Sequence, residues 1–409
     1  MSRTVEAWVT WRGEFLGVTR PFAVDVPWWS EVEPVVAHLH EALGVPVFVL
    51  RLLDVTGGDG ARDGHVAYHV EALRRPQPGR LERRPPDGSA PSALTGADEL
   101  RAPWATPEGL RDLLGWATGE LTDAGRAPTG PAEQRRTWNL AGLFRFPTAR
   151  GPVWLKATPA FAADEAAVIA AFARYDAGLV PRVVAAAERR ILLEHLPGAD
   201  CHEPGPETVT GAVSRLVAAQ AAWARRTPDR PLWLRDRRGS LLAARIGELL
   251  DGEAGRELSR GERASTRELV ARWPLLAECG LPDTVVHGDF HPGNWRSDGG
   301  PPVVVDFADA HWGNPVLDGL RAYDYLPASV RPVAVRAWAE AWQRHLPGCR
   351  PLRALALAEP LAHLAYALRY QEFLDGIEAS ERIYHLGDPA AVIRHALRSA
   401  ATANPHFAA

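Results

Sequence analysis

One short segment of the chain concentrates residues that could carry out chemistry. It reads His287-Gly288-Asp289-Phe290-His291-Pro292-Gly293-Asn294, and Asp306 follows 12 residues after Asn294. Apolar runs at 284–286 and 303–305 predict a short strand on each side. Mg²⁺ prefers a few protein oxygens together with substrate phosphates, and Asn294 and Asp306 could supply those oxygens. Asp289 is then left to accept a proton from a substrate hydroxyl.

Two kinds of element must position this loop. Before it, alternating apolar residues predict strands at 138–146, 153–157, 180–184 and 190–195, with a helix at 163–175. We therefore expect a small sheet with one helix on it. Around and after the loop, helical periodicity dominates, and the expected helices are 206–226, 241–250, 265–279, 315–325, 329–345, 352–373 and 390–402.

The first 125 residues exceed what the small sheet and the helical half need. Residues 1–75 read as an α+β unit, with a helix at 35–43 that we expect to begin at a capping box formed by Ser30 and Glu33. A loop rich in Pro and Arg at 76–91 leads to a second helix, which Thr106 should cap. We predict three parts, namely an accessory domain at 1–125, a small lobe with a hinge at 126–198 and a helical lobe at 199–409.

Composition excludes several classes of protein. The 46 basic residues comprise 45 arginines and one lysine, Lys156, and 50 acidic residues bring the net charge to -4. This balance argues against a nucleic-acid binder. No apolar run is long enough to cross a membrane, and the N-terminus lacks the apolar core of a signal peptide. Three dispersed cysteines favour a reducing compartment, so we expect a cytoplasmic protein.

The loop motif and the later Asp resemble the aminoglycoside phosphotransferase and choline kinase superfamily, over about residues 136–400. The resemblance implies an α+β, protein-kinase-like bilobal fold, to which the N-terminal α+β domain is an addition. It also implies an enzyme that uses ATP and Mg²⁺ to phosphorylate a hydroxyl of a small molecule. In that family the loop Asp is the catalytic base and the other two residues hold magnesium, and those roles fall on Asp289, Asn294 and Asp306. Asp318, in the segment 313–318, should support the loop.

The resemblance also gives the single lysine a role. Kinases place a lysine on the third strand of the small sheet, against the α- and β-phosphates, and Lys156 has that position in chain order. An ammonium group is a compact point charge, whereas guanidinium is larger and planar. Its expected partner is Glu165, with Asp164 as the alternative. The nucleotide base should bind backbone groups of a hinge formed by Glu194, His195 and Leu196.

The acceptor is less well defined by the sequence. Glu372, Asp375 and Glu378 could hold a cationic aminoglycoside, but they could equally be a solvated helix end. The alternatives are a metabolic alcohol of the choline, homoserine or sugar type, or a catalytically silent nucleotide-binding module. The accessory domain could cap the acceptor site, form dimers or brace the small lobe.

Overall fold

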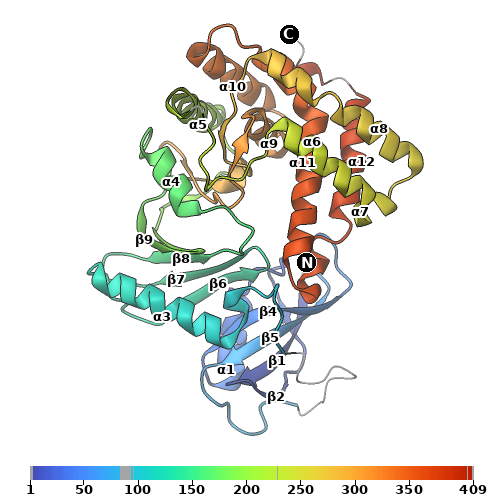
Figure 1. Cartoon of the computed structure of the whole chain (residues 1–409). Helices are drawn as coiled ribbons and strands as arrows, with labels where there is room; N and C mark the ends of the chain where they lie inside the picture. Colours follow the sequence, from blue (N-terminus) through green and yellow to red (C-terminus); the bar gives the residue numbers. More distant parts are fainter. Residues whose placement is uncertain (1–2, 83–93, 95, 228, 403, 408–409) are drawn as a thin grey trace. The chain divides into compact units, whose positions relative to one another are not determined.

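The computed structural model describes residues 3–82, 94, 96–227, 229–402 and 404–407. The predicted loop at 76–91 therefore lies partly outside the described residues. The chain forms two compact units (Figure 1), and both are assembled from separated stretches. Met1–Phe161, Val183–His195 and Phe373–Leu386 form the first unit. Ala162–Arg182, Leu196–Glu372 and Gly387–Ala409 form the second unit. The division into three domains at residues 125 and 198 stays a prediction.

The first unit begins with a mixed sheet covered by one helix. Its strands are β1 (Arg3–Trp11), β2 (Glu14–Val18), β3 (Phe22–Val24), β4 (Val47–Thr56) and β5 (His65–Ala72). The order is β2-β1-β5-β4, with β3 also on β1, and β1 and β5 run parallel. Helix α1 (Glu33–Leu43) buries its apolar side chains in the core of this sheet.

The predicted capping box of α1 is wrong. The helix begins at Glu33 after Val32, and no side chain caps it. The reason is that the backbone just before the helix is already engaged by a distant strand. Thr137 donates its N–H to the carbonyl of Ser30, and Val32 donates to the carbonyl of Arg135. Ser30 is therefore held by strand pairing and does not reach the helix N-terminus.

A second sheet in the first unit is antiparallel throughout. Its strands are β6 (Glu133–Trp138), β7 (Ala141–Phe146), β8 (Val153–Ala157), β9 (Val183–Ala187) and β10 (Arg190–Glu194), in the order β6-β7-β8-β10-β9. The single strand predicted at 138–146 is wrong, because a two-residue turn at Asn139 and Leu140 divides it between β6 and β7. Helix α3 (Pro107–Asp123) packs on this sheet, and Thr106 caps it as predicted, since its side chain accepts the N–H of Gly109.

The N-terminal sheet braces the second sheet through a shared core. Phe48 and Leu50 of β4 pack in one apolar cluster with side chains of β7, β8 and β10. Gln134 of β6 extends this contact, because its side-chain amide donates to the carbonyl of Val49 at 2.7 Å and accepts the N–H of Val49 at 2.9 Å. Of the roles considered for the N-terminal region, bracing the small sheet is the one that these contacts support.

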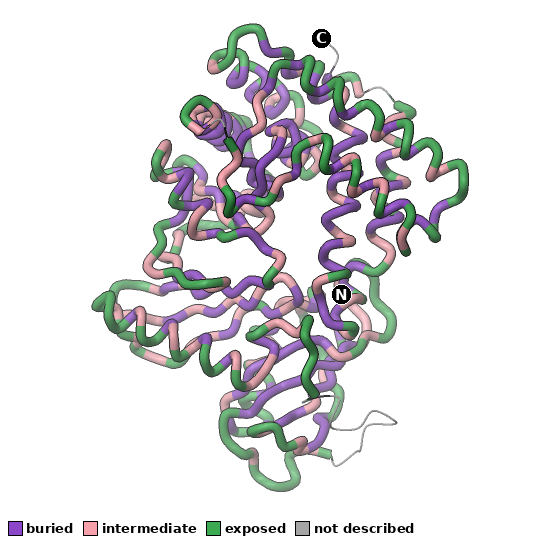
Figure 2. Tube along the Cα trace, viewed as in Figure 1, coloured by how far each residue is buried: buried purple, intermediate pink, exposed green. Residues whose placement is uncertain are grey.

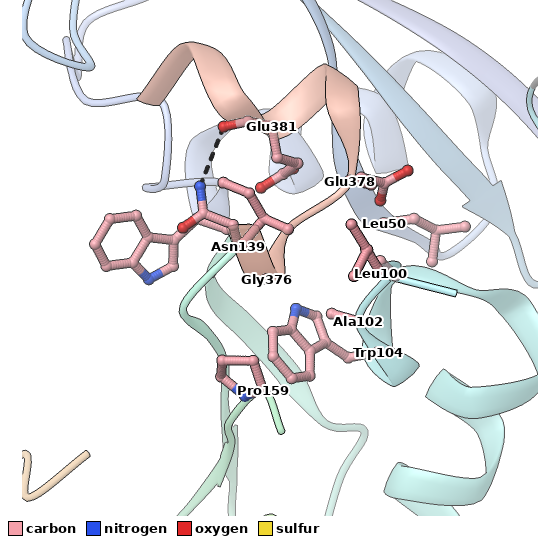
Figure 3. A pocket seen from close by; sticks show the side chains of 12 residues that line it. Leu50, Leu100, Ala102, Trp104, Asn139, Pro159, Gly376, Glu378 and Glu381 are labelled. Atoms are coloured by element: carbon pink, nitrogen blue, oxygen red, sulfur yellow. Dashed lines mark hydrogen bonds between the residues drawn. The ribbon is translucent and has the colours of Figure 1, made fainter. Parts of the chain in front are cut away.

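A C-terminal stretch completes the first unit. The 3-10 helix η4 (Ala379–Tyr384) lies beside β4, where Glu381 accepts the N–H of Leu52 at 2.8 Å. Figure 3 shows the side chain of Asn139 directed at the same helix, where it donates to the carbonyl of Glu381 at 3.3 Å. Glu378 forms buried ion pairs with Arg51 and Arg101. The turn between β6 and β7 is thus held by residues more than 200 positions away.

The second unit is mainly helical, as the sequence predicted. The short strands β12 (Thr284–Val286) and β15 (His311–Gly313) pair with each other, and a three-stranded sheet flanks the loop between them. Helix α11 (Pro351–Gly376) is buried along most of its length (Figure 2), and its last four residues belong to the first unit. Within the described ranges, no helix is long and apolar enough to span a membrane.

The other elements are α4 (Glu165–Ala173), β11 (Ala199–Asp200), α5 (Pro206–Arg226), α6 (Gly239–Asp251), α7 (Glu253–Arg256), α8 (Arg260–Val270), η2 (Trp273–Cys279), η3 (Pro292–Asn294), β13 (Trp295–Ser297), β14 (Val303–Val304), α9 (Val316–Tyr325), α10 (Arg331–His345), α11 (Pro351–Gly376), α12 (Asp388–Ala400) and η5 (Pro405–Phe407), with the one-turn helix η1 (Pro103–Ala105) in the first unit.

Candidate active site

A buried carboxylate holds the loop after β12 in place. Asp318, near the start of α9, accepts the N–H of His287 at 2.8 Å and the N–H of Gly288 at 2.9 Å. Gln220 of α5 donates to the same carboxylate at 2.7 Å. These three bonds tie the loop to two helices, which agrees with the supporting role expected of Asp318.

Gly288 allows the chain to turn at this point. Its φ of +87° is one that side chains rarely adopt, and a Cβ added here would lie 2.2 Å from the carbonyl oxygen of Asp309. The loop therefore runs closer to the segment after β14 than any other residue would permit.

The side chain of His287 orients the next residue. Burial lowers the pKa of His287 to about 4, so the ring is neutral near pH 7. Its Nδ1 accepts the N–H of Asp289 at 3.2 Å, and its Nε2 therefore carries the proton and donates to the carbonyl of Val305 at 3.1 Å. The ring thus connects the loop to the residue that precedes Asp306.

The carboxylate of Asp289 is held on both of its oxygens. Arg321 of α9 donates to Oδ1 from Nε at 2.8 Å and from a terminal nitrogen at 2.7 Å. The amide of Asn294 donates to Oδ2 at 3.0 Å, and Nε2 of His291 lies 3.3 Å from that oxygen. Burial alone would raise the pKa of Asp289, but the charge of Arg321 and the contact with His291 hold this pKa well below its ordinary value. Asp289 is consequently a rigid, fully ionised carboxylate.

Arg321 was not predicted from the sequence. Its guanidinium lies 4.4 Å from the ring centres of both Tyr325 and Tyr366, so two aromatic faces hold it against Asp289. The sequence did hold one indication of its position. Arg321 follows Asp318 by three positions and precedes Tyr325 by four on the same helix, and residues with this spacing share one face. One candidate among 45 arginines does not stand out without the structure.

Asn294 and Asp306 lie beside one another and suit a magnesium ion. Val305 donates its N–H to the carbonyl of Asn294 at 2.9 Å, which brings Asp306 next to the end of the loop. The side-chain nitrogen of Asn294 faces Asp289, so its Oδ1 remains the oxygen available to a cation. Asp306 is exposed, and its backbone has a left-handed φ of +66°. A non-glycine residue keeps this strained conformation only where the surrounding structure holds it in place. The described residues contain no group of three or more His, Cys, Asp or Glu side chains able to hold a metal.

Glu165 is directed at the same region. It is the first residue of α4, it is buried, and it accepts the N–H of Phe307 at 2.9 Å. The alternative, Asp164, is occupied as the N-cap of α4, where it accepts the N–H of Ala167. The structure therefore brings Asp289, Asn294, Asp306 and Glu165 together in the second unit.

Lys156 and most of the hinge belong to the first unit. Lys156 is a buried residue of β8, in register with Leu143 on one side and Ile191 on the other. Its pairing with Glu165 stays a prediction, because the two residues belong to different units.

The three predicted hinge residues follow one another across the junction of the units. Glu194 ends β10 and pairs with Arg126, while His195 accepts the indole N–H of Trp154 at 3.0 Å. Leu196 begins a stretch of the second unit, where its carbonyl accepts a bond from Arg296 at 2.9 Å.

The acids considered for a cationic acceptor are mostly neutralised. Glu372 is buried and bonded to Arg237, to Arg245 at 2.6 Å and to Arg369 at 2.9 Å. Glu378 is buried with its own arginine partners in the first unit. Only Asp375 of the three is exposed. The segment therefore does not form an acidic patch.

Comparison with known sequences assigns the family. The sequence profile of the phosphotransferase enzyme family matches residues 143–355, which is more than half of the 409 residues. The chain belongs to this phosphotransferase family. The match confirms both the resemblance seen in the loop motif and the prediction of a phosphotransferase enzyme. A search of curated protein sequences finds no match to this phosphotransferase.

Solved structures share its fold. The choline kinase LicA from Streptococcus pneumoniae is 12% identical with a TM-score of 0.52, and the match covers 70% of this chain and 98% of the other. A candidate aminoglycoside phosphotransferase from Ralstonia eutropha is 15% identical with a TM-score of 0.51 and the same coverage. A candidate fructosamine-3-kinase from Thermobifida fusca is 20% identical with a TM-score of 0.50, covering 69% and 98%. These similarities confirm the predicted fold class, and about 30% of the phosphotransferase lies outside each match.

Proposed function

We propose that this phosphotransferase transfers the γ-phosphate of ATP to a hydroxyl group of a small molecule. The observation that carries the proposal is the arrangement around Asp289. A half-buried, ionised carboxylate faces the site where Asn294 and Asp306 offer oxygens to a cation, and Asp318 fixes the loop that holds Asp289 and Asn294. Phosphoryl transfer asks little covalent chemistry of a protein beyond such positioning and charge compensation.

Each residue has a distinct task in the proposed reaction. Asp289 orients the acceptor hydroxyl and takes its proton while the acceptor oxygen bonds to the γ-phosphorus. The bond between that phosphorus and the β–γ bridging oxygen breaks, and ADP leaves. Mg²⁺, when bound by Asn294 and Asp306, neutralises phosphate charge. Lys156 contacts the α- and β-phosphates, and Glu165 orients Lys156.

The nucleotide base would bind the backbone of Glu194, His195 and Leu196. Backbone groups are the expected donors and acceptors, because the side chain of Glu194 is paired with Arg126 and that of His195 accepts the indole N–H of Trp154. The enzyme would act inside the cell, where ATP and magnesium are available. Antibiotic inactivation and metabolic phosphorylation use the same machinery and differ only in the acceptor.

Replacement of the proposed base tests this function. Asp289→Ala should lower magnesium-dependent phosphorylation by at least about 100-fold while nucleotide affinity stays nearly unchanged, because general-base contributions are typically of that size or larger. Asp298→Asn, in an exposed turn, is the matched control and should retain full turnover. Near-normal turnover in the Asp289→Ala enzyme would refute the assignment. A wild-type protein that binds nucleotide but transfers no phosphate to any acceptor would instead support a silent binding module.

A further inference from the structure

Helix α9 positions both the backbone and the side chain of the proposed base. Asp318, in its first turn, holds the loop by the N–H groups of His287 and Gly288. Arg321 stands one turn later on the same helix and reaches the carboxylate of Asp289, the next residue of the loop. Residues three positions apart share one face of a helix, so a single rigid element sets where Asp289 lies and which way its carboxylate points.

The side chain of Arg321 is itself held in one place. It is 14% exposed, and its guanidinium carbon lies 4.4 Å from the ring centres of both Tyr325 and Tyr366. Tyr325 is one further turn along α9, whereas Tyr366 is on α11, so the two rings come from different helices. An arginine side chain has many rotamers in the unfolded chain, and this packing selects one of them before any substrate binds.

The hydrogen-bond donors around Asp289 differ between its two oxygens. Both contacts of Arg321 are to Oδ1, at 2.8 and 2.7 Å. Oδ2 has the amide of Asn294 at 3.0 Å and Nε2 of His291 at 3.3 Å. The contact with His291 is the longest of these, so Oδ2 is the oxygen at which an acceptor hydroxyl can most easily replace a donor. Two N–H groups of one guanidinium on Oδ1 keep the carboxylate from rotating during that exchange.

A second ion pair in the same unit provides a comparison. Arg215 of α5 donates to the two oxygens of Asp176 at 2.7 and 2.9 Å, and it also donates to the carbonyl of Pro302. Its side chain and that of Asp176 are 23% and 32% exposed, close to the 14% and 25% of Arg321 and Asp289. Asp176 has no part in the proposed reaction, so this pair is a structural counterpart with similar chemistry and burial.

We propose that Arg321 is a positioning residue for phosphoryl transfer, which holds Oδ1 of Asp289 while Oδ2 takes the proton of the acceptor hydroxyl. The inference rests on the proposed function, because it takes Asp289 as the base. The alternative is that Arg321 and Asp289 contribute only to folding, as a partly buried ion pair can do. The two explanations differ in the effect of replacing Arg321 when Asp289 has already been replaced.

The first experiment replaces Arg321 alone. ADP formation from magnesium and ATP is measured with the full chain, first with water as the acceptor and then with glucose, choline, homoserine and kanamycin in turn. Arg321→Met should lower kcat by about 10- to 100-fold and change the KM for ATP by less than about twofold, because displacement of a reacting group by about 1 Å costs a factor of that order. Arg321→Lys keeps a positive charge without the planar fork and should recover part of kcat. Arg215→Met is the control and should lose stability while kcat stays within about threefold of wild type.

The second experiment is a double-mutant cycle with Asp289→Asn. It also serves where Arg321→Met alone does not fold, because the double variant leaves neither partner as an unpaired charge. If Arg321 acts through Asp289, adding Arg321→Met to Asp289→Asn should leave kcat within about threefold of the Asp289→Asn protein. A further fall of more than about tenfold, or a folded Arg321→Met protein with kcat within about threefold of wild type, overturns the inference. Near-normal turnover of Asp289→Asn, or no ADP formation by the wild type, refutes the proposed function instead.

Discussion

Gly288→Ala tests whether the close approach of the loop to Asp309 sets the position of Asp289, the proposed base. The new Cβ would lie 2.2 Å from the Asp309 carbonyl oxygen, and real Cβ atoms keep at least 3.0 Å, so one of two backbone segments must move by about 0.8 Å. Asp289 is the next residue and would move with it. Misplacement by about 1 Å costs on the order of 100-fold in rate, so kcat should fall by roughly that factor.

Gly387→Ala separates this effect from simple backbone strain. Gly387 has a φ of +83°, close to the +87° of Gly288, but an added Cβ there meets nothing within 4 Å. Both variants should lose about 1–2 kcal/mol of unfolding free energy through the left-handed conformation, and Gly288→Ala should lose more because of the clash. Only Gly288→Ala should lose activity.

The assay is steady-state phosphorylation together with ATP affinity by calorimetry and unfolding by urea. We expect Gly288→Ala to bind ATP as the wild type does, because the bond from the N–H of Val305 to the carbonyl of Asn294 is retained and keeps Asn294 beside Asp306. A kcat within threefold of wild type for a folded Gly288→Ala protein would refute the reasoning, since it would mean that the base tolerates the shift. Equal loss of kcat in Gly387→Ala would attribute the effect to strain alone.

Three further predictions concern the first unit. Lys156→Arg should reduce kcat/KM by at least about tenfold in the phosphorylation assay, because a planar guanidinium does not reproduce a compact ammonium at the phosphates. A fully active variant would show that this position does not require lysine. Gln134→Met should lower the free energy of unfolding in urea by about 2–4 kcal/mol, because it leaves the buried N–H and carbonyl of Val49 without their partner. A loss below about 1 kcal/mol would contradict the bracing role. Burial raises the pKa of Glu381 to about 8, above its unfolded value, so this residue contributes stability at low pH that is lost as the pH rises toward 8, by at most about 1.4 kcal/mol per pH unit. Glu381→Gln should remove that slope in urea titrations between about pH 5 and 8, and an unchanged slope would assign it to other groups.

The sequence could single out the residues of the loop because they are contiguous, and their roles stay predictions. Asp289 and Asn294 stand in one short motif, and a single spacing places Asp306. Arg321 lies on another element and was missed, since only the fold shows which arginine meets Asp289. The sequence also left open whether the acids at 372–378 bind a cation or form a solvated helix end, because composition does not reveal that Glu372 is buried and paired with Arg237.

Two local predictions failed where distant contacts override local pattern. A two-residue turn preserves the alternation of apolar residues, so Trp138 and Leu140 still look like one strand although Asn139 turns the chain between them. The capping box at Ser30 failed because β6, more than 100 residues later, hydrogen-bonds the backbone of that segment.

The return of residues 373–386 to the first unit has a consequence for synthesis of the protein. Arg51 and Arg101 receive their buried partner Glu378, and β4 receives Glu381, only after more than 370 residues have left the ribosome. Until then these buried arginines lack the carboxylate of Glu378, and removing a partner from a buried ion pair is unfavourable. Domains usually fold in order from the N-terminus as the chain is synthesised. Here the first unit also needs residues 373–386, so the stretches of the second unit up to Glu372 leave the ribosome before the first unit can finish folding. A fragment cut after Phe161 should therefore be a poor stand-alone protein, and a stop codon near the end of α11 should damage the opposite end of the chain.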